Sequence, residues 1–184
     1  MATVDIRAWT SADVDDIAAL HARSWQATYR GIFTDEFLDG PVIDDRRRVW
    51  SERAAQPDPD RATFVALVDA SLAGFTHVVS HHEDGPGALL DNLHVDAAAR
   101  GVGLSSRLLA RAASWAHDVH GVDAMHLWVA ASNAHAIDVY GHLGAEVDRT
   151  DVHDDGGGPF EVLCMTWRGT AWGTLLERDR GAGS

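Results

Sequence analysis

The amino-acid sequence predicts an α/β fold, a single domain in which a mixed β-sheet is flanked by helices. The chain of 184 residues has the length of one domain rather than two. Apolar residues make up 46% of it and charged residues 23%, which is typical of a globular protein with a buried core. Segments with strand and helix patterns follow one another in the order β, α, α, β, β, β, α, β, α, β, β.

The first third of the chain is predicted to form one strand followed by helices. Val4–Trp9 has the pattern of a short strand. Thr10 begins a helix, because its hydroxyl can cap free N–H groups and the acids Asp13 and Asp15 favour the positive end of a helix. We expect this helical region to end at Gly31. Two further helical segments are expected, over residues 34–38 and 43–55.

The rest of the chain is predicted to hold most of the sheet. The prolines within residues 56–60 indicate a turn. The strands expected after it cover residues 63–68, 72–80, 88–95, 124–131, 145–150 and 160–167. The expected helices cover residues 102–117 and 134–142. Residues 169–184 are weakly patterned, so we expect a domain over residues 1–168 and a C-terminal tail after it.

Composition argues against several classes of partner. The net charge is −13, and such a surface repels nucleic-acid phosphates and anionic lipids, so we expect no nucleic acid and no membrane partner. No segment approaches the roughly 20 apolar residues that a membrane span needs. The N-terminus lacks the basic region and apolar run of a signal peptide, and the lone Cys164 allows no internal disulfide. These features suit a cytoplasmic location.

The most informative segment is residues 90–106, where a predicted strand leads through a glycine-containing loop into a helix. Gly101 and Gly103 allow the backbone to approach a ligand closely. The first N–H groups of a helix have no partner within it, and the helix dipole adds positive charge there. Residues 97–117 contain three arginines and no acid, although 28 acids in 184 residues would give about three in such a window. These features predict an anion site suited to a pyrophosphate.

Two common phosphate-binding motifs do not fit this segment. A P-loop ends in Gly-Lys-Ser or Gly-Lys-Thr, and the chain has neither sequence. A dinucleotide-binding fingerprint requires a third glycine where Ser106 stands. It also requires the strand to end beside the first glycine, whereas residues 96–100 intervene.

The run Arg100-Gly-Val-Gly-Leu-Ser resembles the acetyl-CoA signature Gln/Arg-x-x-Gly-x-Gly/Ala of the GNAT (Gcn5-related) N-acetyltransferases, with Ser105 in place of the last small residue. The later run from Asn133 through Tyr140 to Gly144 resembles a second signature of this family, Asn-x-x-Ala-x-x-x-Tyr-x-x-x-Gly-Phe, with Ala145 in place of phenylalanine. The two runs lie in the order and at the spacing of the family. The resemblance extends over roughly residues 3–168.

The resemblance implies a GNAT fold with a mostly antiparallel sheet and an acetyl-CoA-dependent N-acetyltransferase activity. In this family a primary amine attacks the acetyl thioester directly. The backbone of the fourth strand then holds the carbonyl and the pantetheine, which assigns that role here to Leu93, His94 and Val95. Asn133 matches a residue that binds the cofactor arm, and Tyr140 matches the general acid that protonates the departing thiolate. The residues that would hold the pyrophosphate are Arg100, Gly101, Val102, Gly103, Leu104, Ser105 and Ser106.

The general base and the acceptor site are less defined by the resemblance. Some members carry a glutamate on the fifth strand, and Trp128 stands at that position here. The candidates near the reaction centre are Asp91 and His94, and a histidine has the more suitable ordinary pKa. Trp25 and Tyr29 share one helix face and, with Trp128, are candidates for lining the acceptor pocket.

Three interpretations remain open at this point. The first is acetyl transfer to an unidentified small-molecule or peptide amine, with acetyl-CoA as cosubstrate, no metal, and a homodimer as an open alternative to the monomer. The second is a non-catalytic acyl-CoA-binding sensor or scaffold. The third is a metal-dependent hydrolase that uses the cluster His77, His81, His82 and Glu83, although this cluster lacks the helical His-Glu-x-x-His pattern of zinc enzymes.

Overall fold

The computed structural model describes residues 3–99, 101–154 and 158–182, and it contains a seven-stranded mixed sheet. The strands lie in the order β1-β2-β3-β4-β5-β7-β6. Their bounds are Val4–Ala8, Arg61–Val68, Ser71–Val79, Ala88–Val95, Met125–Ala130, Glu146–His153 and Phe160–Trp167 for β1 to β7. Only β4 and β5 run parallel, and all the other neighbouring strands are antiparallel. The mostly antiparallel mixed sheet expected from the sequence is thus confirmed.

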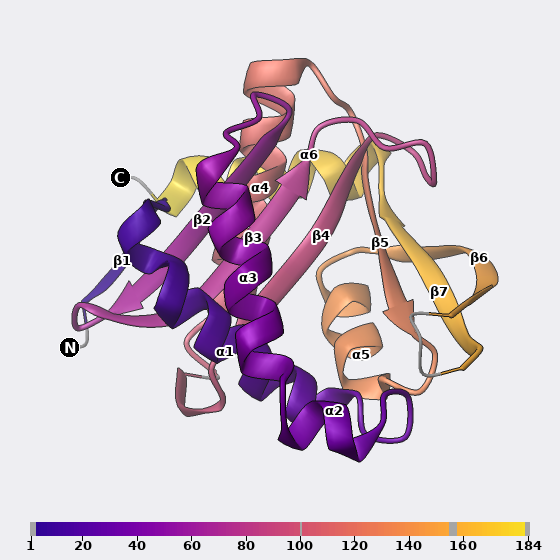
Figure 1. Cartoon of the computed structure of the whole chain (residues 1–184). Helices are drawn as coiled ribbons and strands as arrows, with labels where there is room; N and C mark the ends of the chain where they lie inside the picture. Colours follow the sequence, from indigo (N-terminus) through magenta and orange to yellow (C-terminus); the bar gives the residue numbers. More distant parts are fainter. Residues whose placement is uncertain (1–2, 100, 155–157, 183–184) are drawn as a thin grey trace.

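Helices cover both faces of the sheet (Figure 1). The α-helices α1 to α6 span Val14–Thr28, Asp35–Asp39, Val42–Ala55, Leu104–His120, Ala134–His142 and Gly169–Ala182. Two short 3-10 helices, η1 and η2, span Ser11–Asp13 and Ala97–Ala99. Helices α1 and α3 lie on one face, and α4 and α6 lie on the other. Within the described ranges, no helix is both long and apolar enough to cross a bilayer.

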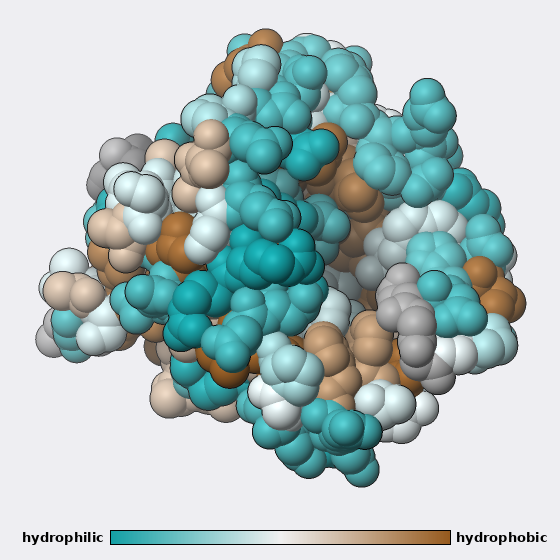
Figure 2. All heavy atoms as spheres, viewed as in Figure 1, coloured by the Kyte–Doolittle hydropathy of each residue, from teal (hydrophilic) through white to brown (hydrophobic). Residues whose placement is uncertain are grey.

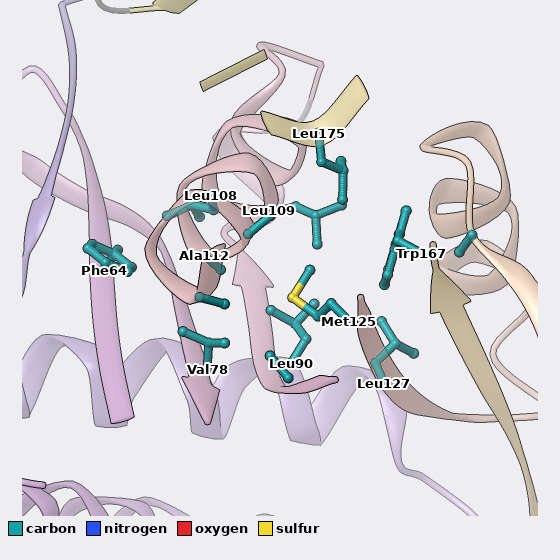
Figure 3. Packing of buried hydrophobic residues seen from close by; sticks show 14 of the residues in the cluster. Phe64, Val78, Leu90, Leu108, Leu109, Ala112, Met125, Leu127, Trp167 and Leu175 are labelled. Atoms are coloured by element: carbon teal, nitrogen blue, oxygen red, sulfur yellow. The ribbon is translucent and has the colours of Figure 1, made fainter. Parts of the chain in front are cut away.

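Each face of the sheet has its own hydrophobic cluster. The larger cluster joins the strands to α4 and α6, and Figure 3 shows Leu109, Met125 and Leu175 brought together in it from three different elements. The smaller cluster lies under α1 and α3 and contains Trp50 and Phe75, both fully buried. Burial of these apolar side chains fixes the helices against the sheet and therefore fixes the loops between them.

The sequence patterns located most elements correctly. The bounds expected for β4 and α5 match the structure, and α4 begins at Leu104, two residues later than expected. The segment from residue 169 onward differs from the weakly patterned tail that the sequence led us to expect, because residues 169–182 form α6. Trp172, Leu175 and Leu176 lie at helical spacing, are buried and belong to the larger cluster. The helix therefore forms through packing against α4, although its three glycines give it a weak intrinsic preference.

An ion pair ties the start of α1 to the edge of the sheet. The guanidinium of Arg7 on β1 donates to both carboxylate oxygens of Asp13, at 2.8 and 2.7 Å. The carboxylate also accepts from the backbone N–H of Thr10 at 2.7 Å. The Arg7 hydrogen bonds outweigh the opposing effect of burial and lower the pKa of Asp13 to about 2.

Candidate active site

The two parallel strands separate along most of their length. Strands β4 and β5 pair at only two positions, Ala88 with Met125 and Leu89 with His126. Beyond Leu89, β4 keeps its pairing with β3 while β5 keeps its pairing with β7. Because successive N–H groups of a strand point to opposite edges, part of the β4 backbone faces this gap without a strand partner.

A cavity of about 200 Å³ lies in the gap. Its walls include residues 90–95 of β4 and residues 127–129 of β5. Tyr29, the C-cap of α1, lines it from one face of the sheet. Ser105 of α4, Tyr140 of α5 and Asn133, the N-cap of α5, line it from the other. The cavity therefore links the two faces of the sheet at the point where the strands diverge.

A β-bulge turns two adjacent polar side chains of β4 to the same face. The β3–β4 register changes between the pairs His77–Asn92 and Val78–Leu90, so Asp91 is an extra residue. Asn92 and its partner His77 lie on the face covered by α1 and α3, since His77 packs against Trp50. Asp91 points to that face too, because its carboxylate binds Arg53 of α3. Figure 2 shows a hollow over this part of the sheet, beside α3.

The carboxylate and imidazole candidates on this face are held by hydrogen bonds. Asp91 Oδ2 accepts from Arg53 Nη2 at 2.8 Å and from Asn92 Nδ2 at 2.6 Å. His94 Nδ1 lies 2.7 Å from the Ser24 hydroxyl of α1. Burial lowers the pKa of His94 to about 4, so its ring is neutral at pH 7. This face therefore offers a paired carboxylate and a neutral imidazole beside the cavity.

The loop before α4 has the geometry of an anion site. Gly101 and Gly103 adopt positive φ values of 84° and 76°, a region that only glycine enters easily. Gly103 is the N-cap of α4 and supplies no capping side chain, so the first N–H groups of the helix remain available to a ligand. The first turn holds no acid. Arg100, predicted to contact the same anion, lies outside the described residues.

The remaining side chains of this predicted loop have different surroundings. Ser105 lines the cavity. The Leu104 side chain is buried in the larger cluster and the Val102 side chain is 53% exposed, so both can offer only their backbone to an anion. The Ser106 hydroxyl accepts a hydrogen bond at 3.0 Å from Nη1 of Arg178, which lies on α6. Helix α6 thereby brings a cation to the start of α4.

Tyr140 and Asn133 come from α5 on the opposite side of the cavity. Asn133 caps the helix, because its side-chain oxygen accepts from the Ala136 N–H at 3.1 Å. The Tyr140 ring packs edge-on against Trp167 at 5.9 Å. Burial raises the pKa of the Tyr140 hydroxyl, and the neighbouring Tyr29 adds to this effect. The phenol is therefore fully protonated at neutral pH, so it holds a proton that can be transferred.

The aromatic residues predicted for the acceptor pocket are in different positions. Tyr29 and Trp128 line the cavity, and the guanidinium of Arg149 lies 4.9 Å from the Trp128 ring. Trp25 does not line the cavity, and its ring stacks on Phe33 at 5.0 Å. Sequence reasoning did not identify Ser24, Thr28 or Arg53 as neighbours of the site. No local motif marks them, because Ser24 and Arg53 bind His94 and Asp91 of β4, which lie tens of residues away in the chain.

The histidine cluster considered as a metal site makes separate contacts. His77 lies on β3 with its Nδ1 2.7 Å from the Thr63 hydroxyl, and the His81 ring faces His120 at 6.2 Å. His82 approaches Asp84 at 3.4 Å. Among the residues that the structure describes, no three His, Cys, Asp or Glu side chains are grouped so that they could hold a metal ion.

Comparison with known families identifies a match over most of the chain. Residues 19–145 match the model of the acetyltransferase (GNAT) family. This range contains β4, the start of α4 and all of α5, which are the elements that surround the cavity. A comparison with curated proteins found no significant match.

Solved structures with the same fold cover nearly the whole chain. PaiA N-acetyltransferase from Thermoplasma acidophilum, in complex with coenzyme A, is 20% identical with a TM-score of 0.73, covering 89% of this chain and 98% of its own. A spermidine N-acetyltransferase SpeG mutant from Vibrio cholerae is 18% identical with a TM-score of 0.66, covering 95% and 97%. Ribosomal-protein-alanine N-acetyltransferase from Brucella melitensis is 21% identical with a TM-score of 0.67, covering 88% and 98%. These likenesses support the fold.

Proposed function

Because the chain belongs to the acetyltransferase (GNAT) family and is therefore an acetyl-CoA-dependent N-acetyltransferase, we propose that a primary amine is its acceptor and attacks the thioester directly. The observation that carries this proposal is the cavity between β4 and β5. The edge of β4 that lacks a strand partner and the Tyr140 phenol both line this cavity. Asp91 and His94 line it as well, and their side chains lie on the face of the sheet opposite Tyr140.

The cofactor would enter from the side of α4 and α5. The N–H groups that follow Gly101 and Gly103 would bind its pyrophosphate, since a helix start with glycines before it favours an anion. The pantetheine arm would lie in the gap, beside Asn133 and the backbone of Leu93, His94 and Val95. Acetyl-CoA supplies the activated acetyl group, and the chain orients it.

The transfer requires one bond to form and one to break. The amine nitrogen bonds to the carbonyl carbon, and the electron pair of the carbonyl moves to its oxygen, where N–H groups of β4 stabilise the negative charge. The adduct collapses, the carbon–sulfur bond breaks, and Tyr140 donates its proton to the thiolate. The surplus proton of the amine leaves toward Asp91 or His94 on the α3 side. The raised pKa of Tyr140 ensures that the phenolate regains a proton from solvent.

The charge of the protein and the names of two proteins of the same fold support a cationic amine as the acceptor class. Asp91 and the net charge of −13 favour a cationic acceptor over an anionic one. Two proteins of the same fold are named for acetylation of spermidine and of ribosomal-protein alanine, and both names describe primary amines. A small polyamine and a peptide with a free N-terminus are therefore the first acceptors to test.

The test measures release of the free coenzyme A thiol from acetyl-CoA in the presence of spermidine, other diamines or a peptide that begins with alanine. We expect release with at least one amine, and Tyr140→Phe should lower kcat by about 10²–10⁴-fold while acetyl-CoA still binds. Calorimetry of acetyl-CoA binding is the control. Tight binding without thiol release for any amine would instead support the non-catalytic sensor.

A further inference from the structure

A second and larger cavity adjoins the acetyl site, because Arg53 on its wall binds Asp91 on the wall of the first cavity. Its volume is about 730 Å³, which falls in the range of about 300–1,000 Å³ occupied by small-molecule sites. Its walls come from residues 9–11, from the end of α3 with the turn after it, and from the facing parts of β2 and β3. It shares no lining residue with the cavity between β4 and β5.

A buried histidine lines this cavity with one ring nitrogen lacking a partner. The His77 side chain is 3% exposed, and its Nδ1 lies 2.7 Å from the Thr63 hydroxyl. Its Nε2 is buried and has no hydrogen-bond partner among the described residues. Burial, aided by the charge of Arg53, lowers the pKa of His77 to about 3, so the ring is neutral. The Thr63 hydroxyl can donate to Nδ1, and in that tautomer Nε2 carries the hydrogen and is a donor.

An arginine presents a second donor beside it. Arg53 uses Nη2 to bind Asp91, while its Nη1 is buried without a partner in the described part of the chain. The guanidinium lies 4.7 Å from the ring of Trp50, and the His77 ring lies 5.7 Å from the same indole. Both side chains thus pack against the same buried indole. Leaving such groups buried without an acceptor is unfavourable, more so for a charged group.

We propose that this cavity binds a small organic carboxylate, whose two oxygens accept hydrogen bonds from Arg53 Nη1 and His77 Nε2. A carboxylate offers two acceptor oxygens and no donor, which matches two donors that lack an acceptor. Trp9, which packs edge-on against Trp50 at 5.5 Å, provides a wall for an apolar body together with Val49.

The charges around the cavity permit an anion. The acids that line it are Glu52 and Asp58, and each is paired, with Arg48 at 3.0 Å and with Arg61 at 3.1 Å respectively. The bond of Arg53 to Asp91 uses the other nitrogen of the guanidinium. A carboxylate can therefore bind without breaking the ion pair beside the acetyl site, and the proposal does not depend on the identity of the acceptor.

The probe is 4-fluorobenzoate, titrated with the full-length protein and followed by ¹⁹F NMR. We expect saturable binding with a Kd of about 1 mM or lower. The neutral 4-fluorobenzyl alcohol should bind at least about tenfold more weakly, because it lacks the anion. Saturating acetyl-CoA should leave the signal unchanged. Absence of saturation, equal binding of the alcohol, or displacement by acetyl-CoA would each overturn the proposal.

Two pairs of variants test the named donors. His77→Gln keeps an amide near the position of Nε2, whereas His77→Asn keeps one near Nδ1, so only the second should weaken the probe by about tenfold. Arg53→Met should weaken it by a similar factor, while Arg47→Met should not, because Arg47 lies on the same helix and neither it nor its partners Asp15 and Asp44 line the cavity. Thermal unfolding checks that each variant folds. If Arg53→Met fails to fold, the two His77 variants still test the proposal. Equal affinity of both variants for the probe would contradict a hydrogen bond from His77 Nε2.

Discussion

The two ends of α4 allow a direct test of the anion site, because each end has a glycine in the same unusual conformation. Gly103 caps the start with φ 76° and ψ 15°, and Gly121 caps the end with φ 66° and ψ 25°. A Cβ added at either position meets no atom within 4 Å. Gly103→Ala and Gly121→Ala therefore impose the same backbone strain without a clash, and only the first lies where a diphosphate would bind.

The loss of stability can be worked out from this geometry. A left-handed conformation costs an alanine about 1–2 kcal/mol. The reduced freedom of the unfolded chain offsets about 0.4–1 kcal/mol of it. Each variant should therefore lose about 1 kcal/mol, which lowers Tm by about 2–4 °C for a protein of this size. The similar dihedral angles predict nearly equal shifts for the two variants.

Binding of acetyl-CoA should separate the two variants. Gly103→Ala adds a methyl group at the loop where the diphosphate would bind, so we expect a Kd raised by about tenfold or more. In Gly121→Ala the Kd should remain that of the unchanged protein. Calorimetry measures the Kd, and thermal unfolding measures the Tm. Equal Kd values for both variants would refute the placement of the pyrophosphate at this helix start.

Three further predictions concern other parts of the structure. Asp13→Asn should lower the free energy of unfolding by about 2 kcal/mol at pH 7. Because the folded pKa of Asp13 is about 2 and the ordinary value is 3.8, this difference should be complete above about pH 4 and vanish as the pH falls through 2, as acid titrations of unfolding would show. Trp172→Ala should cost about 3–5 kcal/mol in denaturant unfolding, since this side chain is 5% exposed within the larger cluster, and a change below about 1 kcal/mol would contradict that packing. Arg178→Met should raise the KM for acetyl-CoA by about threefold at low salt, leave the KM of the amine unchanged and lose its effect at high salt, because it removes an exposed cation beside Ser106.

Several strands and helices could be predicted from sequence patterns within their own residues or in the residues that flank them. The strand Ala88–Val95 has apolar residues on both sides of Asp91 and Asn92 and ends before a loop, and the helix Ala134–His142 lies between a capping asparagine and Gly144. Such signals act over a few residues, so a single sequence is sufficient to read them. Gly101 and Gly103 were likewise identified as loop glycines before a helix, and the structure gives both of them positive φ values.

The parts that could not be predicted depend on contacts between distant residues. No sequence pattern near Asp91 predicts the β-bulge that turns its side chain toward α3, because the change of register arises from pairing with β3. Its partner Arg53 lies 38 residues away, and Ser24 lies 70 residues from His94. Helix α6 was missed for a related reason. Its few apolar residues, including Trp172, become a stabilising face only when α4 is present.

The separation of β4 and β5 also bears on how the protein avoids aggregation. Unpaired strand edges tend to recruit strands from other chains. Here the open edge lies inside the sheet, between Tyr29 on one face and Asn133 and Tyr140 on the other. A gap of about 200 Å³ has no room for an added strand of several residues. The backbone is thus exposed to a slender ligand while a second polypeptide is kept out.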